Sequence, residues 1–400
     1  MNLAVLNLKN YLAKKSWQEC LFIFFVAVWI MSLPFKNAVY QISQPLIILY
    51  FLIYIFITKN YKPLLKNLEK TRHLALGFGL LFLSMIVANF LNPELLDKKS
   101  WHITLMFLVR YAMMFVMLAY FYTLGFFSKK EIIAAVFASF FLLTFTAIYQ
   151  ILGDVNVLFD IKEGLTGSLT NRNATGLMMG LAVTSSIVLF SYSRKLSPVF
   201  MIYFIFFMIF SFSRSAWVAS FTAGVCFVVL NFKSFDKKDK RALLIYIIVI
   251  LLFLSIFWFG FDSLKTRLNE LLEGNSSNRY LIWKYSWSMF LQNPLFGYGV
   301  DTFRNLPDSV VKFDGHFNST HNMPLEILLY TGIFGFLASF FTIFLIFKQL
   351  CKNLVLLPVG VHFLVATQFD YGAYSSKELL SYLTILVFLA YADEFRKKTL

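Results

Sequence analysis

Long apolar runs, separated by short polar segments, are the dominant pattern along this chain. About 20 mostly apolar residues are needed for one helix to cross the hydrocarbon core of a bilayer. Backbone groups inside a bilayer must bond to one another, so such runs form helices rather than irregular chain. Twelve runs fit and predict an all-α integral membrane protein with about twelve transmembrane helices. They cover residues 17–33, 38–58, 73–91, 102–124, 131–152, 174–192, 198–212, 215–231, 242–260, 323–347, 354–370 and 379–392.

Two places in this pattern have alternative interpretations. Only the Ser213-Arg214 region separates run 198–212 from run 215–231, so this stretch is either two short helices or one broken span. The first run follows basic residues, as the apolar part of a signal peptide does, but no small-residue cleavage site comes after it. It therefore predicts an uncleaved first span.

The polar segments between the runs predict the orientation, because Lys and Arg are enriched in cytoplasmic loops. With the N-terminus inside, the inner segments carry 22 of the 36 Lys and Arg residues and the outer segments carry 13. Arg110 is the remaining one and lies within a run. Both termini are thus predicted to be cytoplasmic. On this topology the net charge of +15 reports orientation and not an anionic partner such as nucleic acid.

Composition supports the membrane class. The chain is 59% hydrophobic and 14% charged, whereas ordinary globular chains are about 25% charged. These values exclude a soluble domain, a disordered chain, a collagen and a coiled coil. The three cysteines have no spacing typical of a metal site or a disulfide framework.

One outer segment is much longer than the others. Residues 261–322 form a loop of 62 residues, and a long loop in a compact protein is usually functional. Leucines at helical spacing and then an aromatic stretch predict short amphipathic helices along the membrane surface. The chain is thereby divided into helices one to nine in 1–260, the long outer loop in 261–322, and helices ten to twelve in 323–400.

Ionisable residues within or beside apolar runs are functional hypotheses by default, because burying a charge in a membrane is costly. Arg110 is one of them. Another is Arg172, in the stretch Thr170-Asn171-Arg172-Asn173 before the sixth run. This stretch is interpreted either as a polar cradle for phosphate or sugar, or as a helix cap with an interfacial arginine.

Two further arginines are candidate anion-binding groups. Arg214 precedes a helix whose N-terminal N–H groups point to the same place, and an arginine beside a helix N-terminus binds anions. The alternative is an arginine that reaches lipid headgroups. Arg279, in Ser277-Asn278-Arg279, opens the aromatic stretch and is predicted to hold phosphate, whereas Trp283 and Trp287 indicate an interfacial aromatic belt.

His321 is the candidate general base. It lies at the outer start of the tenth helix, where Asn322 suits the N-cap and Pro324 the first turn. Histidine is the usual base near neutral pH, and the alternative is an interfacial histidine bonded to water or backbone. His316 is a weaker candidate, and His362, within a run, is predicted to be structural. The sequence carries no metal-ligating, nucleotide-binding or serine-hydrolase motif.

The run His321-Asn322-x-x-Leu325-x(6)-Gly332 resembles the His-Asn signature of the bacterial O-antigen ligase family, and Gly335 follows closely. The resemblance covers about residues 160–350, and the first 150 residues match only as generic spans. The other similar features are Arg214 after a short run, Arg279 in the large outer loop, the Asn-Pro-Leu-Phe-Gly-Tyr-Gly stretch at 293–299, and the twelve-span layout.

The resemblance implies a GT-C-like glycosyltransferase of the bacterial inner membrane with a periplasmic active site. Such ligases transfer a completed O-antigen glycan from undecaprenyl pyrophosphate to a sugar hydroxyl of lipid A–core oligosaccharide, without a metal or another cofactor. Carried over to this chain, Arg214 and Arg279 hold the donor pyrophosphate and His321 acts as base on the acceptor hydroxyl. Arg172 is a further donor contact. The supporting residues are Asn322, Asn173 and Arg110.

Two other functions are kept as alternatives. An O-antigen polymerase shares the superfamily and topology, but its acceptor is a second lipid-linked repeat unit. A transporter also fits twelve spans and basic loops, yet it is expected to carry polar or broken segments at the membrane midplane. Here the polar candidates gather at the outer surface instead.

Overall fold

A computed structural model describes residues 15–35, 38–169, 171–191, 193–274, 279–307, 319–369 and 377–396. No strand occurs among these residues, and each of the twelve apolar runs overlaps a helix, which confirms the all-α class. The π-helical stretch η2 (Leu108–Met113) joins α6 and α7 into one helix. The α-helices are α2 (Trp17–Ser32), α3 (Ala38–Thr58), α4 (Lys62–Lys70), α5 (Arg72–Leu91), α6 (Lys98–Phe107), α7 (Met114–Thr123), α8 (Lys129–Gly153), α9 (Arg172–Val188), α10 (Leu196–Phe210), α11 (Arg214–Asn231), α12 (Lys237–Gly260), α13 (Asp262–Leu272), α14 (Arg279–Gln292), α16 (Met323–Leu350), α17 (Leu357–Ala366) and α18 (Lys377–Arg396). The short 3₁₀ helices are η1 (Pro93–Leu95), η3 (Val155–Leu158), η4 (Gly167–Leu169), η5 (Leu189–Ser191) and η6 (Phe303–Asn305).

The helices have the length and surface of a membrane protein. In the described part of the chain, six segments are long and apolar enough to cross a membrane. These are Val39–Thr58, Arg72–Leu91, Lys98–Thr123, Lys129–Gly153, Arg214–Asn231 and Met323–Leu350. Large side chains such as Phe56, Phe145 and Phe259 are exposed on the outside, as expected in lipid. The count of twelve crossings stays a prediction, because α2, α10 and α17 have only 16, 15 and 10 residues.

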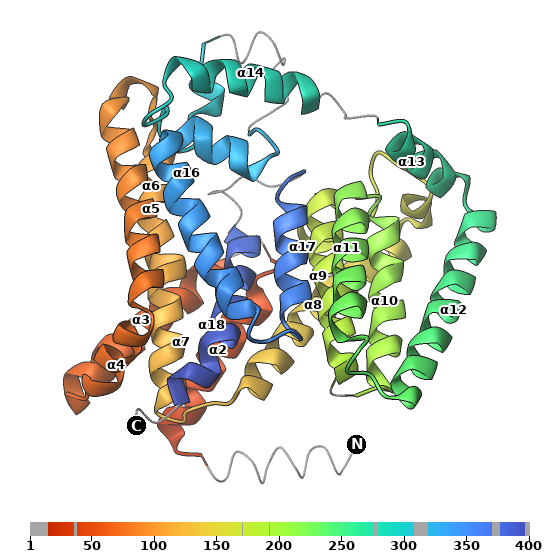
Figure 1. Ribbon diagram of the computed structural model, residues 1–400, viewed down its shortest axis with the longest axis horizontal. Helices are drawn as coiled ribbons and strands as arrows, with labels where there is room; N and C mark the ends of the chain where they lie inside the picture. The colour runs from red at the N-terminus through yellow and green to blue at the C-terminus, as the bar shows by residue number, and fades with distance from the viewer. Residues whose placement is uncertain are drawn as a thin grey trace.

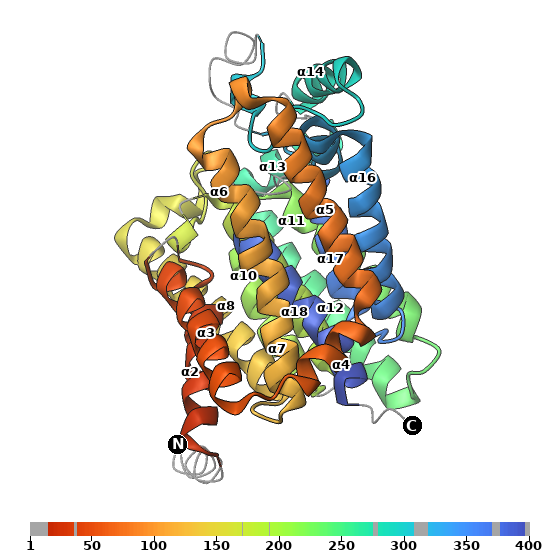
Figure 2. The same ribbon diagram turned by 90° about the vertical axis from the view of Figure 1, so that its left-hand side faces the viewer.

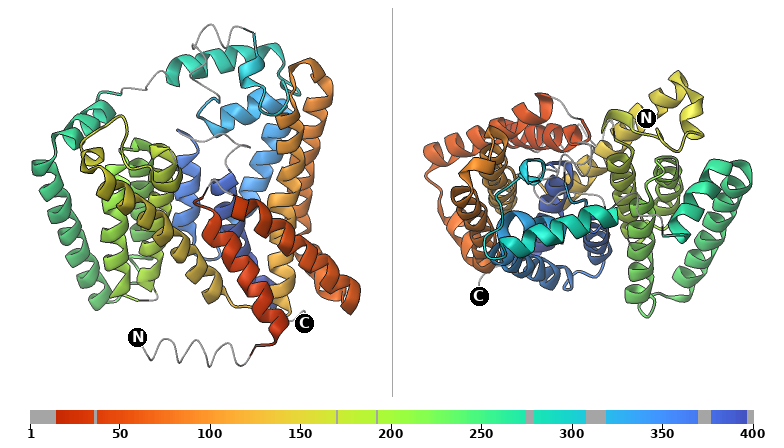
Figure 3. Two further views of the ribbon diagram at one scale, coloured as in Figure 1. Left: turned by 180° about the vertical axis from the view of Figure 1, so that it is seen from behind. Right: turned by 90° about the horizontal axis from the view of Figure 1, so that it is seen from above.

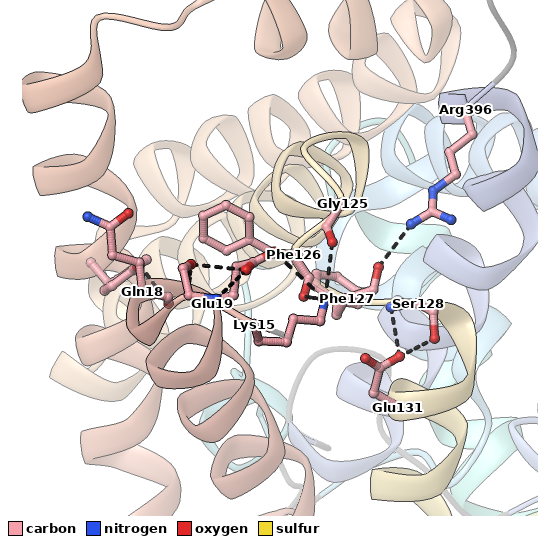
Figure 4. A network of polar contacts seen from close by, with 11 residues as sticks. Lys15, Gln18, Glu19, Gly125, Phe126, Phe127, Ser128, Glu131 and Arg396 are labelled. Atoms are coloured by element: carbon pink, nitrogen blue, oxygen red, sulfur yellow. Dashed lines mark hydrogen bonds and ion pairs between the residues drawn. The ribbon is translucent and has the colours of Figure 1, made fainter. Parts of the chain in front are cut away.

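The helices stand side by side, and α13 and α14 cover one end of the bundle, here named the loop end (Figure 1). The first and last described residues meet at the other end. Lys15 Nζ donates to the carbonyl oxygen of Gly125 at 3.2 Å, and Arg396 Nη2 donates to that of Phe127 at 3.1 Å (Figure 4). The two ends of the described chain therefore share one side of the bundle, as the predicted topology requires.

Two apolar clusters hold the bundle together. The larger one joins α2, α3, α7, α8, α9, α10, α17 and α18. The smaller one joins α5, α6 and α14 to the first half of α16, and Figure 2 shows α5, α6 and α16 rising to meet α14 at the loop end. Helix α12 stands at the edge of the bundle, beyond α10 and α11 (Figure 1).

Helix α16 is broken at Gly332, whose φ of 63° and ψ of −165° are not helical. Residues 293–299 pack against the α16 backbone at this break, so this stretch has a structural role. A side chain on Gly332 would bring its Cβ within 2.2 Å of the Leu295 carbonyl oxygen. The backbone N–H donors and carbonyl acceptors that join the two segments are Tyr298 to Leu329 at 3.0 Å, Gly299 to Tyr330 at 2.9 Å, and Ile333 to Pro294 at 2.8 Å.

Replacing Gly332 by alanine is expected to destabilise the fold. The φ and ψ of Gly332 lie in a region essentially restricted to glycine, which costs another residue about 1–3 kcal/mol. The contact with Leu295 adds overpacking strain of about 1–3 kcal/mol. The matched control is Gly79→Ala in α5, where an added Cβ meets nothing within 4 Å and alanine favours the helix. Thermal unfolding in detergent should show a lower midpoint for Gly332→Ala only. Equal midpoints for the two variants would contradict this interpretation of the break.

Candidate active site

The Ser213-Arg214 region is a tight turn between two helices, not the middle of a broken span. Helix α10 ends at Phe210 and α11 begins at Arg214, and the two helices lie side by side (Figure 1). The chain reverses through Phe212, whose φ is 53°, a region that bulky residues rarely adopt. Arg214, at 7% exposure, is buried in the first turn of α11.

The start of α9 lies against this turn, because a glycine permits close approach. A Cβ on Gly176 would lie 2.3 Å from the Ser213 Cβ, so only glycine fits there. Arg172 is the first residue of α9, and the Asn171 side chain caps that helix by accepting from the N–H groups of Asn173 and Ala174. The N-termini of α9 and α11, which favour anions, are thus neighbours.

Arg172 and Asn173 line an open polar pocket beside the α9 start. The pocket also contains Lys162 and Glu163 of the preceding loop and Gln150 of α8. The helix cap is therefore present, whereas the cradle for phosphate or sugar stays a prediction. Thr170, Ser277, Asn278 and His316 lie outside the described residues.

His321 lies at the loop end in a turn before α16, with a φ of 51°. Asn322 caps α16, as predicted, by accepting from the Leu325 N–H at 2.9 Å. Thr320 Oγ1 accepts from the Asn322 N–H at 3.1 Å. His321 is therefore held between two bonded neighbours, and its side chain is partly exposed.

Helix α17 connects the His321 turn to the arginine-bearing helices. The Asn322 side chain donates to the Gln368 carbonyl at 3.1 Å, and the Met323 N–H donates to the Thr367 carbonyl at 2.8 Å. Further down, His362 of α17 is fully buried between α9 and α11. Its ring nitrogen Nδ1 lies 3.5 Å from Ser220 Oγ, which agrees with the structural role predicted for His362.

Helix α14, which begins at Arg279, contacts the His321 turn. The Trp283 indole N–H donates to the Thr320 carbonyl at 3.0 Å, directly beside His321. Arg279 is the first residue of α14 and precedes Trp283 by four positions, so the two share one helix face. Seen from above, α14 lies across the loop end (Figure 3). Trp287 is about half exposed, and the interfacial belt suggested for the two tryptophans stays a prediction.

Arg110 lies elsewhere. It belongs to the π-helical stretch η2, and its guanidinium carbon is 5.9 Å from the Tyr40 ring centroid. The Gln44 side chain donates to the Arg110 carbonyl at 3.1 Å. These contacts place Arg110 against α3, and the structure does not bring it to His321 or to Arg214.

Two residues that the sequence did not single out, Arg267 and Glu270, lie beside Arg214. Arg267 of α13 is 8% exposed and donates through Nε to the Phe212 carbonyl at 2.9 Å. It pairs with Glu270, whose Oε2 also lies 3.8 Å from Arg214 Nη1. In the described residues, no three His, Cys, Asp or Glu side chains are grouped to hold a metal ion.

The comparison with protein families covers part of the chain that carries these residues. The family described as O-Antigen ligase matches residues 199–340. That segment contains Arg214, Arg279 and His321, but not Arg110 or Arg172. No curated protein matches the chain. The resemblance noted in the sequence is thus confirmed over residues 199–340, the segment of this chain that matches the O-antigen ligase family.

Proposed function

We propose that this protein transfers a glycan from undecaprenyl pyrophosphate to a sugar hydroxyl of the lipid A–core oligosaccharide, at the periplasmic face of the inner membrane. The observation that supports the proposal is that His321, Arg214 and Arg279 all lie at or near the start of a helix. Each begins or directly precedes a helix at the loop end, within the matched segment. The loop 261–322 at this end is the segment predicted to be periplasmic, with both termini cytoplasmic.

In this proposal the donor pyrophosphate binds between Arg214 and Arg279. Arginine forms strong charge-assisted bonds to phosphate. Negative charge grows on the leaving pyrophosphate during transfer, so positioned arginines stabilise the transition state more than the ground state. The N-termini of α9 and α11 add their partial positive charge, and Arg172 is a further contact. No metal or nucleotide sugar enters the proposed reaction.

The lipid part of the donor requires an apolar path beside the phosphate site. An apolar cavity of about 490 Å³ lies between α10, α11 and α12, and Leu264 and Leu268 of α13 also line it. Arg267 lies on the same helix, between these two leucines in sequence. A hydrocarbon chain bound in this cavity would have its phosphate near Arg214. This supports a lipid-linked donor.

His321 is proposed to remove the proton from the acceptor hydroxyl as that oxygen attacks the anomeric carbon. A base on the side opposite the leaving pyrophosphate makes the reaction a single displacement. We therefore expect inversion at the anomeric carbon. Linkage analysis of the product by NMR tests this expectation, and a product that keeps the donor's configuration would contradict it.

The acceptor distinguishes a ligase from a polymerase of the same superfamily. A deletion strain complemented with wild-type protein is the direct test. If the protein is a ligase, the deletion leaves lipid A–core without any repeat unit, and finished glycan remains on the carrier lipid. Core capped by a single repeat would indicate a polymerase and contradict the proposal.

A further inference from the structure

A charged group joins α13 to the start of α11. The Glu270 atom Oε2 forms an ion pair with Arg267 and lies 3.8 Å from Arg214 Nη1. Both arginine side chains are buried, whereas the Glu270 side chain is 29% exposed. One carboxylate oxygen thus faces two buried cations, and solvent reaches it.

Arg267 also holds the turn before Arg214 in its unusual conformation. Its Nε–H donates to the Phe212 carbonyl at 2.9 Å, and the Phe212 side chain is fully buried. Since Phe212 has a positive φ, the turn depends on its surroundings to stay in place. Arg267 is therefore a positioning residue for Arg214.

Helix α13 is anchored where it begins. Leu264 is buried, and the Phe261 ring lies 4.9 Å from the Phe210 ring, centroid to centroid. Leu264, Arg267 and Glu270 are three positions apart, so they share one face of the helix. The anchored face presents the Glu270 carboxylate to Arg214.

We infer that Glu270 is the resident counter-ion of the phosphate site and that the donor must displace it from Arg214. This inference rests on the proposed function. The Arg214 contact is long and Glu270 keeps its pair with Arg267, so the carboxylate can leave Arg214 without losing every partner. A pyrophosphate carries more negative charge than a carboxylate and displaces it. A monoanionic phosphodiester headgroup competes poorly, so Glu270 keeps abundant membrane phospholipids out of the site.

The test compares wild type, Glu270→Gln and Glu273→Gln, each as full-length protein in nanodiscs. Glu273 is the matched control, since it is exposed at the end of the same helix. The probe is inorganic pyrophosphate, and its Kd is measured by calorimetry in discs of phosphatidylcholine, with and without phosphatidylglycerol.

Glu270→Gln is expected to lower the pyrophosphate Kd about three- to tenfold in phosphatidylcholine discs, since it removes a competing charge. With phosphatidylglycerol present, the lower pyrophosphate Kd of Glu270→Gln should return to the wild-type value, because the lipid then occupies the site of this variant. Wild type and Glu273→Gln should respond little to phosphatidylglycerol. An unchanged Kd in Glu270→Gln, an equal shift in Glu273→Gln, or no pyrophosphate binding by wild type would overturn the inference.

Glycan transfer by the same wild-type preparation separates this inference from the proposed function. If wild type transfers glycan but Glu270→Gln has the same pyrophosphate Kd as wild type, the counter-ion role is refuted and the ligase proposal stands. A tighter Glu270→Gln Kd without any transfer supports the counter-ion role and refutes the ligase proposal.

Discussion

Replacing His321 by alanine is expected to reduce glycan transfer by about 10²- to 10⁴-fold, the range that general-base catalysis contributes. The acceptor hydroxyl then keeps its proton as it attacks, so the loss should fall on kcat, while donor binding by the arginines persists. Because hydrogen bonds of Thr320 and Asn322 hold the turn, the variant should insert and fold normally. Transfer with purified protein measures the effect.

The matched control is His102→Ala. His102 is an exposed histidine of α6, and α6 reaches the loop end close to α14 (Figure 2). This variant should keep wild-type activity. Full activity in His321→Ala would remove the proposed base from the mechanism.

Replacing Arg279 by alanine is expected to lower kcat/KM for the lipid-linked donor by about 10²- to 10³-fold, the loss typical of one positioned transition-state donor. Arg279→Lys should recover only part of this activity, because lysine keeps the charge but cannot bind phosphate through two parallel bonds. The measurement is transfer rate against donor concentration at saturating acceptor.

Arg304→Ala serves as the control for charge, since Arg304 is an exposed arginine of η6 in the same loop. It should change donor kinetics less than threefold. Similar losses in Arg279→Ala and Arg304→Ala would mean that the loop attracts the donor by general charge, which contradicts a specific phosphate contact.

The helices and part of the site are predictable from sequence for simple physical reasons. Apolar runs long enough to span a bilayer form helices in lipid, because their backbone groups can bond only to one another there. The structure has a helix at every one of these runs. Arg214 and His321 are identifiable because each is an ionisable residue directly before an apolar helix. The Asn322 cap also follows from residue type alone, since its side chain accepts the N–H that the first turn leaves open.

The rest depends on contacts between distant segments. Arg267 bonds to Phe212, 55 positions away, and only the tertiary structure shows why this arginine differs from the other basic residues of the loop. The Trp283 contact with Thr320 joins positions 37 apart, so the sequence does not show it either. The break at Gly332 is hidden inside a continuous apolar run, and its partner segment 293–299 lies in a different region of the sequence.

The most direct test of the central claim is glycan transfer with purified components. Full-length protein in detergent is incubated with undecaprenyl-pyrophosphate-linked glycan and with lipopolysaccharide that ends at the core, and the products are separated by gel electrophoresis. We predict that wild type converts core lipopolysaccharide into its glycan-bearing form and that His321→Ala does not. Absence of transfer by folded wild-type protein, or transfer to a second lipid-linked glycan in place of the core, would contradict the ligase assignment.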